Sequence, residues 1–206
     1  EAGFLLADGV SVEAIDKAAK RFGMPMGPLR LVDEVGVDIS QHAGQAMYEA
    51  LGERLSPAPP IVALAESGRL GKKGGVGFYR YEGAKEKGVD SDIYAVLSST
   101  VPAGRVEMDE REIRGRLVLA MVNEAARVLD DGIVQRASDV DLAMIMGTGF
   151  PPFRGGLLRF ADTIHARTVL DRLEELEGRF GARFAPADAI RRLARSDNSF
   201  YQSFAR

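Results

Sequence analysis

The chain of 206 residues contains no cysteine and only two histidines. Without cysteine it cannot form a disulfide, a thiolate nucleophile or a cysteine-based zinc site, and we expect it in the reducing cytoplasm. His42 and His165 lie in polar, helix-surface contexts, with no serine or acid at a spacing that indicates a catalytic base. We expect both histidines to face solvent, and we expect no metal site because no ligand spacing is present.

The sequence also lacks a basic excess and a long apolar run. Charged residues make up 28% of the chain and the formal net charge is −3, so no nucleic-acid partner is expected. No apolar stretch approaches the roughly 20 residues that span a bilayer, so no membrane span is expected. Glu1-Ala2-Gly3-Phe4 has neither an initiator Met nor a signal segment, which indicates a cut chain. The 46% of apolar residues suffice for one large core or two small ones.

The chain contains an internal duplication. The segment Leu5-Leu6-Ala7-Asp8-Gly9-Val10 after Glu1-Ala2 resembles Val128-Leu129-Asp130-Asp131-Gly132-Ile133 after Glu124-Ala125. Downstream, Asp16 and Asp33 recur as Asp141 and Asp162, and the loop at 22–27 recurs at 148–156 with small insertions. The sequence therefore predicts two related units, residues 1–100 and 101–206.

Both units have helical patterns. In the second unit, residues 109–131 predict one helix of about 23 residues, about 35 Å long, which is apolar on every side from Leu117 to Val122 and should run through a core. Glu124 lies in its last third, so we expect Glu1 to begin two thirds of the way along the matching helix, leaving the first unit truncated at its N-terminus.

The remaining pattern is also helical, with Ser11 as a capping residue and Pro28 in a first turn. No alternating strand pattern of useful length appears. The Gly- and Lys-rich segment 83–90 is predicted to be an exposed linker. Further helices are predicted at 12–21, 28–34, 38–55, 60–67, 138–146, 156–164, 166–180 and 186–194.

The segment Gly71-Lys72-Lys73-Gly74-Gly75-Val76-Gly77 is rich in glycine and lysine but has the wrong spacing for a phosphate loop. A dinucleotide loop would also need a strand before it and a helix after it, whereas here a helix precedes and an extended aromatic segment follows. We interpret it as a structural turn that docks Phe78 and Tyr79. The alternative is that Lys72 or Lys73 contacts a ligand phosphate.

Both copies carry a Gly-Pro loop, at Gly23–Pro28 and Gly149–Pro152. Glycine lets a backbone approach a ligand closely, so these loops could line a pocket, but their occurrence in both copies favours a tight interhelical turn. Duplication also favours a scaffold role over catalysis for four carboxylates, whose expected partners are loop N–H groups. These are Glu1, Glu124, Asp33 and Asp162.

Three motifs, taken in order, resemble the C-terminal domain of 3-hydroxyacyl-CoA dehydrogenases. They are Phe22-Gly23-Met24-Pro25-Met26-Gly27-Pro28 with Val32-Asp33 and Val35-Gly36-Val37-Asp38, then Leu70-Gly71-Lys72-Lys73-Gly74 with Gly77-Phe78-Tyr79, then Met121-Val122-Asn123-Glu124 with Gly149-Phe150-Pro151-Pro152-Phe153-Arg154-Gly155-Gly156. Two such units in tandem resemble the alpha subunits of multifunctional fatty-acid oxidation proteins, which also hold an enoyl-CoA hydratase domain. The resemblance implies an all-α fold of the 6-phosphogluconate dehydrogenase C-terminal type, with no Rossmann domain in these residues.

The resemblance implies NAD-dependent oxidation of a 3-hydroxyacyl-CoA to a 3-ketoacyl-CoA, a step of fatty-acid β-oxidation. In the family, the His–Glu pair that removes the hydroxyl proton and the Gly-rich NAD loop belong to a preceding Rossmann domain. None of them is expected here, so NAD binds the full-length protein outside this chain, and the chain alone is expected to be inactive and to bind no cofactor.

What the resemblance leaves to this chain is one wall of an acyl-CoA cleft. Some relatives have a substrate-contacting Tyr just before the second Gly-Phe-Pro-Pro loop, where this chain has Met146, whose flexible side chain suits an acyl chain. Candidate substrate-binding residues are Met146, Gly147, Gly149, Phe150, Pro151, Met24 and Pro25. No catalytic, cofactor or metal residue is assigned.

Two other functions remain open at this point. The chain could be an interaction module, covered by the missing Rossmann and hydratase domains, by a second copy in a homodimer or by a thiolase subunit. It could instead be the helical domain of another 3-hydroxy acid dehydrogenase, which would show no CoA preference. An exposed apolar patch would favour the first of these, and acyl-CoA binding would favour the dehydrogenase.

Overall fold

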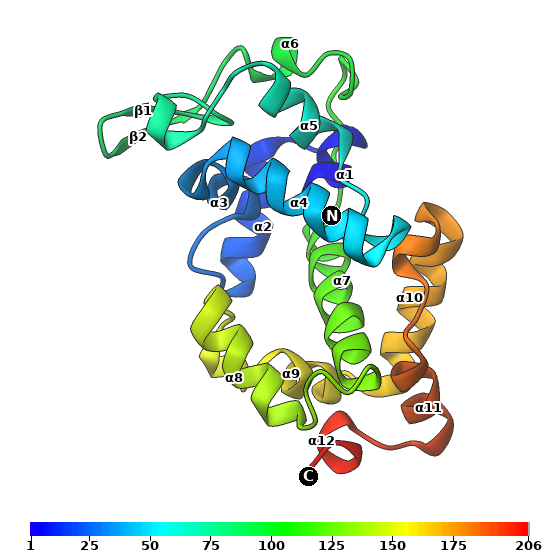
Figure 1. Cartoon of the computed structure of the whole chain (residues 1–206). Helices are drawn as coiled ribbons and strands as arrows, with labels where there is room; N and C mark the ends of the chain where they lie inside the picture. Colours follow the sequence, from blue (N-terminus) through cyan, green and yellow to red (C-terminus); the bar gives the residue numbers. More distant parts are fainter. Residues whose placement is uncertain (206) are drawn as a thin grey trace. The chain divides into compact units, whose positions relative to one another are not determined.

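The computed structural model describes residues 1–205, and these are mostly helical (Figure 1). The helices are α1 (Ala2–Ala7), α2 (Val12–Phe22), α3 (Pro28–Val35), α4 (Val37–Leu51), α5 (Pro59–Glu66), α6 (Ile93–Val96), α7 (Glu110–Asp130), α8 (Ala137–Thr148), α9 (Leu157–Thr163), α10 (Ala166–Phe180), α11 (Asp188–Ser196) and α12 (Phe200–Ser203). In the described residues the one sheet is a hairpin of β1 (Tyr79–Glu82) and β2 (Lys85–Val89). The all-α prediction is confirmed.

Local signals at the ends of helices explain why the predicted boundaries hold. The Oγ of Ser11 accepts the backbone N–H of Ala14 at 3.2 Å, so it caps α2 as predicted. Glu13 lies in the first turn of this helix and Lys20 and Arg21 lie in its last turn. At these ends the negative and the positive charges interact favourably with the helix dipole. Pro28 opens α3, where its missing N–H would have had no helical partner.

The prediction of one helix over residues 38–55 was wrong at its C-terminal end. Helix α4 ends at Leu51 because Gly52 adopts a positive φ of 77°, and Glu53–Leu55 then forms a separate 3-10 turn. The short helices α6 and α12 were not predicted. Each has only four residues, fewer than a periodic apolar pattern needs to be recognised.

By packing, the described chain forms two compact units. Unit 1 comprises residues 1–22 and 26–114, and unit 2 comprises residues 23–25 and those from Gly115 onward. The core of unit 1 includes Leu5, Leu6, Val12, Ile15, Phe22, Leu29, Leu64, Phe78 and Ile93. The core of unit 2 includes Val118, Val122, Val140, Leu157, Leu158, Val169, Leu173, Phe184, Ile190, Leu193 and Phe200.

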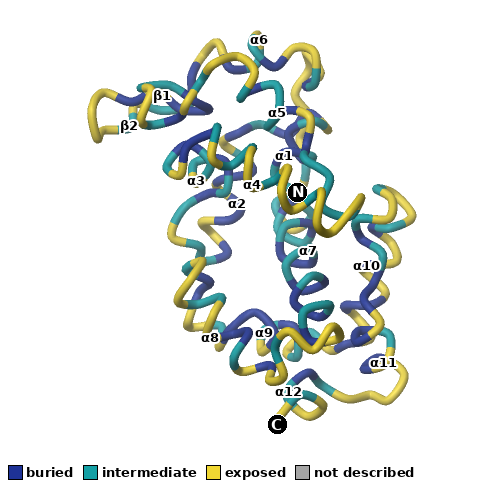
Figure 2. The backbone as a smooth tube through the Cα atoms, in the orientation of Figure 1, coloured by how far each residue is buried: buried dark blue, intermediate teal, exposed yellow. Residues whose placement is uncertain are grey.

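The helix predicted at 109–131 is observed as α7, with 21 residues. Val118, Leu119 and Val122 are buried, and Figure 2 shows buried or intermediate positions along most of this helix. Its all-round apolar sequence therefore does mark a core helix. The polar Asn123 on the same helix is also buried, and both ends of its amide are bonded: Nδ2 donates to the carbonyl of Ala185 at 2.9 Å and Oδ1 accepts the N–H of Ala187 at 2.8 Å.

The prediction of an exposed linker at residues 83–90 was wrong, because residues 85–89 form β2 and pair with β1. The alternation of buried and exposed residues that is typical of a strand is present only in β1. Tyr79 and Tyr81 are buried while Arg80 and Glu82 are exposed, a period-2 alternation over four residues. Strand β2 has the sequence Lys-Glu-Lys-Gly-Val, in which both lysines are exposed and no residue is buried, so its composition alone resembles a loop.

Asp90 anchors the end of this hairpin. Its backbone N–H donates to the carbonyl of Phe78 at 2.9 Å, and its carboxylate forms ion pairs with Arg69 at 2.6 Å and with Arg80. Burial alone would raise the pKa of Asp90, but the two guanidinium groups outweigh it and hold the pKa below its ordinary value.

The stability that Asp90 contributes should therefore depend on pH with a defined sign. A lowered pKa in the folded state means that the contribution is present above the ordinary carboxyl value of 3.8 and is lost as the pH falls through the lowered pKa. We expect the wild-type chain to exceed D90N in unfolding free energy by about 1–2 kcal/mol at pH 7, since exposed Arg80 is partly screened by solvent. Urea titrations of both proteins from pH 7 to 3 should show this difference shrink only below about pH 4; a constant difference would contradict the assignment.

Candidate functional site

Two buried aspartates hold equivalent helix starts in the two units. Asp16 of α2 accepts the N–H groups of Leu29 and Arg30, each at 2.9 Å, and thereby caps α3. Asp141 of α8 accepts those of Leu158 at 2.6 Å and Arg159 at 3.0 Å, at the start of α9. These aspartates therefore join each helix to the one after the Gly-Pro loop.

A second pair of aspartates joins each unit's next helix to an aromatic dipeptide. Asp33 accepts the N–H groups of Phe78 at 3.0 Å and Tyr79 at 2.9 Å. Asp162 accepts those of Phe200 at 2.7 Å and Tyr201 at 3.1 Å. Asp33 and Asp162 do accept backbone N–H groups, as predicted, but only that of Phe78 belongs to a loop, because Tyr79 begins β1 and Phe200 and Tyr201 begin α12. Glu124, in contrast, pairs with Arg127 of its own helix at 3.4 Å.

Tyrosine hydroxyls complete both clusters. Tyr79 donates to Asp16 at 2.7 Å, Tyr201 donates to Asp141 at 2.9 Å, and Tyr81 donates to Asp33 at 3.1 Å. Burial is the largest cause, and the adjacent carboxylate the next, that raises the pKa of Tyr79 and of Tyr81 far above the ordinary tyrosine value. Burial and the hydrogen bond to Asp141 raise the pKa of Tyr201 to about 12. The hydroxyls therefore remain protonated donors at any ordinary pH.

Burial raises the pKa of the Asp16 and Asp33 carboxyls too, although the hydrogen bonds that they accept oppose this rise. In Asp162 burial likewise raises the pKa against the N–H groups of Phe200 and Tyr201. A raised pKa in a buried carboxyl can indicate a general acid. Here Asp16 and Asp33 each accept two backbone N–H groups and a tyrosine hydroxyl, and Asp162 accepts two backbone N–H groups, so these carboxyls hold parts of the fold together.

The Gly-Pro loops are turns with little space, as predicted. A Cβ on Gly27 would lie 2.1 Å from Cγ of Asp16, and one on Gly156 would lie 2.2 Å from Cγ of Asp141. Only glycine fits against these carboxylates, in both units. This close approach of backbone to side chain explains the repeated glycines without a ligand.

Several of the candidate substrate-binding residues lie together in unit 2. A Cβ on Gly149 would meet Cγ of Pro25 at 2.8 Å, and one on Gly23 would meet Pro151 at 2.9 Å and the ring of Phe153 at 2.5 Å. The loop at 23–25 therefore lies against the turn at 149–153. Met24 is half-buried next to Pro25.

The remaining candidate substrate-binding residues differ in how far their side chains are exposed to solvent. Phe150 is fully buried and belongs to the core of unit 2, so its side chain is not available to a ligand. Met146 is 77% exposed on the last turn of α8, beside exposed Gly147. Sequence reasoning missed two further exposed apolar side chains, those of Leu142 on α8 and of Phe153 on the turn after it, with Phe153 75% exposed.

The homologous helix α2 shows what is unusual about α8. Because Asp16 and Asp141 occupy equivalent positions, Lys17 and Arg21 of α2 correspond to Leu142 and Met146 of α8. Both lysine and arginine are exposed, as a solvent-facing helix surface should be. The same surface of α8 is apolar, and this comparison between the copies is the signal by which the sequence could have revealed Leu142.

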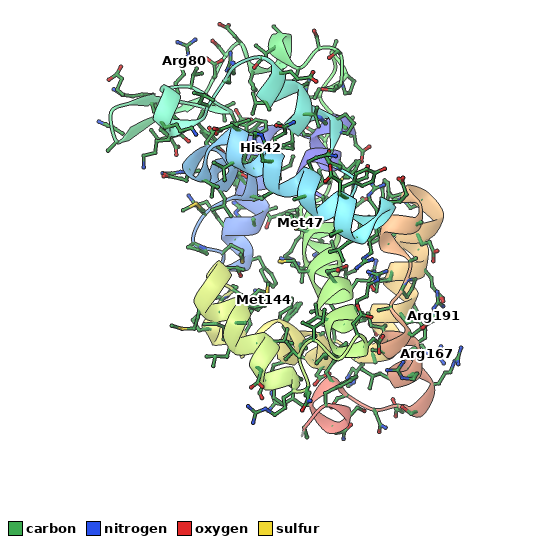
Figure 3. The ribbon with its side chains drawn as sticks, in the orientation of Figure 1. His42, Met47, Arg80, Met144, Arg167 and Arg191 are labelled. Carbon is green, nitrogen blue, oxygen red and sulfur yellow. The ribbon has the colours of Figure 1, made fainter. Side chains whose placement is uncertain are left out.

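We call Leu142 and Met146 the α8 surface. Met144 of the same helix, labelled in Figure 3, is half-buried. On the turn after α8, the guanidinium of Arg154 lies 5.4 Å from the ring centre of Phe153 and 5.3 Å from that of Phe160. An exposed aromatic ring beside a guanidinium suits a molecule with both an apolar and an anionic part.

The segment at 71–77 is a structural turn. Lys72–Gly74 forms a 3-10 turn, and the following Phe78 and Tyr79 are buried, as predicted. The Nζ of Lys72 contacts Glu34 at 2.8 Å and that of Lys73 contacts Asp38 at 2.6 Å. Both lysines therefore have carboxylate partners, on α3 and α4, and the phosphate-contact alternative stays a prediction.

Residues 1–205 contain neither a buried histidine nor a group of metal-ligating side chains. His42 and His165 are exposed, as predicted, and no group of three or more His, Cys, Asp or Glu residues in this range could hold a metal ion. No helix in the same range is both long and apolar enough to cross a membrane.

A family model described as the C-terminal domain of 3-hydroxyacyl-CoA dehydrogenase matches residues 1–81 and again residues 113–202. The alpha subunit of the fatty acid oxidation complex from Shewanella sp. (strain W3-18-1) is 39% identical over 203 residues, which is 98% of this chain and 28% of that protein. The corresponding subunit from Vibrio cholerae serotype O1 (strain ATCC 39541) is 39% identical over 201 residues, with the same coverage. The chain thus spans less than a third of the length of these curated relatives.

Solved structures share the fold. The 3-hydroxybutyryl-CoA dehydrogenase from Escherichia coli K12 superposes with a TM-score of 0.74 at 23% identity, covering 95% of this chain and 57% of that one. The dehydrogenase part of multifunctional enzyme 1 from C. elegans gives 0.69 at 23% identity, covering 93% and 45%. The order of motifs, the paired aspartate clusters and the two family-model matches agree: this chain belongs to the 3-hydroxyacyl-CoA dehydrogenase C-terminal domain family.

Proposed function

We propose that this chain is the substrate-binding part of an NAD-dependent 3-hydroxyacyl-CoA dehydrogenase of fatty-acid β-oxidation, with residues 1–100 and 101–206 as its two family units. The observation that carries the proposal is the α8 surface, an exposed apolar helix face where the homologous α2 is charged. Under this proposal the acyl chain lies against Met146 and Leu142, and the Gly149–Pro151 turn with Met24 and Pro25 forms the adjoining wall.

The redox step is assigned to other parts of the polypeptide. The described residues do not fit NAD, because they contain no strand, Gly-rich turn and helix in succession, and the lysines of the Gly71–Gly77 segment are bound to carboxylates. We infer that a catalytic His–Glu pair and the NAD site lie in a Rossmann domain of the whole enzyme. A hydratase domain would be a further, separate domain of that enzyme. The relatives are long enough for both, since this chain matches 28% of their length.

Calorimetric titration of this chain with CoA, butyryl-CoA, octanoyl-CoA and octanoate tests the proposal. Each CH₂ group that leaves water contributes up to about 0.8 kcal/mol, so affinity should rise with chain length by up to about fourfold per methylene. The double variant L142E/M146E should lose this dependence on chain length. K17E is the matched control, because it adds negative charge at the position of α2 that corresponds to Leu142, and it should keep the dependence.

Three results would contradict the proposal. An equal dependence on chain length in wild type and L142E/M146E would remove the α8 surface from the site. Equal affinity for octanoate and octanoyl-CoA would favour a dehydrogenase of other 3-hydroxy acids. Reduction of NAD by this chain alone with 3-hydroxybutyryl-CoA would contradict the assignment of the redox step to another domain.

A further inference from the structure

Met146, on the last turn of α8, is the most exposed of the large apolar residues in the described part of the chain, at 77%. The next residue adds no cover, because Gly147 has no side chain and a Cβ built on it would meet nothing within 4 Å. The space beside Met146 is therefore open, and a small solute can reach its thioether sulfur.

Met146 is one of seven methionines, and the others are less exposed. Met47 on α4 is 49% exposed, and Figure 3 labels it together with Met144. The half-buried methionines are Met24, Met26, Met108, Met121 and Met144. Met47 therefore provides an exposed methionine outside the α8 surface, against which the reactivity of Met146 can be measured.

The sulfur gives Met146 a reaction that its neighbour Leu142 lacks, because a hydroperoxide oxidises a thioether to a sulfoxide. The sulfur attacks the outer peroxide oxygen, and an S–O bond forms as the O–O bond breaks. The displaced oxygen takes up the proton of the attacked one and leaves as water or an alcohol, so the sulfur loses the two electrons that the peroxide gains. The chain has no cysteine, whose thiolate would react with the peroxide first.

Oxidation would change the polarity of the α8 surface without adding a bulky group. A sulfoxide is polar and its oxygen accepts hydrogen bonds, whereas the thioether is apolar. Met146 lies one turn after Leu142, so the sulfoxide would hold water beside the other apolar side chain of the surface. An acyl chain that packs there would displace this water without replacing its hydrogen bonds, which lowers the affinity.

The homologous helix indicates that the fold tolerates a polar group at this position. Arg21 of α2, which corresponds to Met146, is exposed and forms an ion pair with Glu110 at 2.5 Å. A polar side chain at the end of this helix is therefore compatible with the packing around it. Oxidation of Met146 should change binding and leave the unfolding temperature unchanged.

We propose that Met146 is a reversible oxidation site, at which a hydroperoxide converts the α8 surface from apolar to polar and thereby lowers its affinity for an acyl chain. The inference rests on the proposed function, because it requires an acyl chain to pack against Met146. Reduction of the sulfoxide by methionine sulfoxide reductases would restore the apolar surface.

Peptide mapping by mass spectrometry, after timed exposure to hydrogen peroxide, tests the site. Met146 should be oxidised before Met47 and before the half-buried methionines. Octanoyl-CoA should slow the oxidation of Met146 and leave that of Met47 unchanged, whereas acetyl-CoA, which has almost no acyl chain, should protect neither. Earlier oxidation of Met47, or equal protection of both residues, would overturn the assignment to Met146.

Calorimetry, after the peroxide has been removed, measures the consequence. The oxidised chain should bind octanoyl-CoA about fivefold more weakly and lose most of its dependence on chain length, and treatment with sulfoxide reductases should restore both. M146L has no sulfur at this position, so its affinity should be the same before and after peroxide. M47L is the matched control and should respond to peroxide as wild type does.

The outcomes separate this inference from the proposed function. No dependence on chain length before oxidation would overturn the proposed function and this inference with it. Dependence that peroxide leaves intact, or an M146L variant as sensitive to peroxide as wild type, would overturn the oxidation site alone. An unfolding temperature that peroxide lowers in wild type and not in M146L would overturn the role of Met146 as a surface residue.

Discussion

Replacing Asp33 by alanine is expected to lower the free energy of unfolding by about 3–5 kcal/mol, since each buried donor without an acceptor costs about 1–3 kcal/mol. Three donors depend on this carboxylate: the N–H groups of Phe78 and Tyr79 and the hydroxyl of Tyr81. Asp33 is fully buried, so water cannot replace the lost acceptor without a change in packing. Chemical denaturation followed by circular dichroism measures the loss.

Two matched variants separate this effect from a general cost of losing a carboxylate. D33N keeps one acceptor oxygen in nearly the same volume, so it should fall between wild type and D33A. D162A removes the homologous carboxylate, which serves two N–H donors in a half-buried site, and should cost less than D33A. A D33A loss of less than about 1 kcal/mol would show that the cluster does not hold unit 1 together.

The duplication explains why so much of the scaffold could be predicted from the sequence. Asp16 and Asp33 could be assigned structural roles because each recurs in the second copy, and the structure places both pairs on backbone N–H groups at equivalent positions. Helices α7 and α10 were predicted within one residue at each end, since their apolar periodicity is long and uninterrupted.

What could not be predicted depends on three-dimensional environment. Strand β2 is stabilised by pairing with β1 and has almost no apolar pattern of its own. Phe150 belongs to a motif that suggests a pocket, yet its ring completes the core of unit 2. Met146 was selected by resemblance and Leu142 could have been found by comparing α8 with α2, whereas the exposure of Phe153 requires knowledge of how its turn packs.

The glycines of the Gly-Pro loops should be among the least replaceable residues of the chain. G27A would put a methyl group 2.1 Å from Cγ of Asp16, so either the carboxylate or the start of α3 must move. Overpacking of this kind costs about 1–3 kcal/mol, and displacing Asp16 would also break its bonds to Leu29 and Arg30. We expect a total loss of about 3–4 kcal/mol.

G156A tests the same contact in unit 2 with one added cost. Its Cβ would lie 2.2 Å from Cγ of Asp141, and Gly156 has a φ of 116°, which alanine adopts only with strain of about 1–3 kcal/mol, whereas Gly27 has an ordinary φ of −74°. G156A should therefore destabilise at least as much as G27A. Gly178, inside α10 with nothing within 4 Å of its would-be Cβ, is the control: G178A should stabilise by about 0.5–1 kcal/mol through helix propensity. If G27A and G156A unfold like G178A, the carboxylates are not in contact with these loops, and the turns would again need a ligand to explain their glycines.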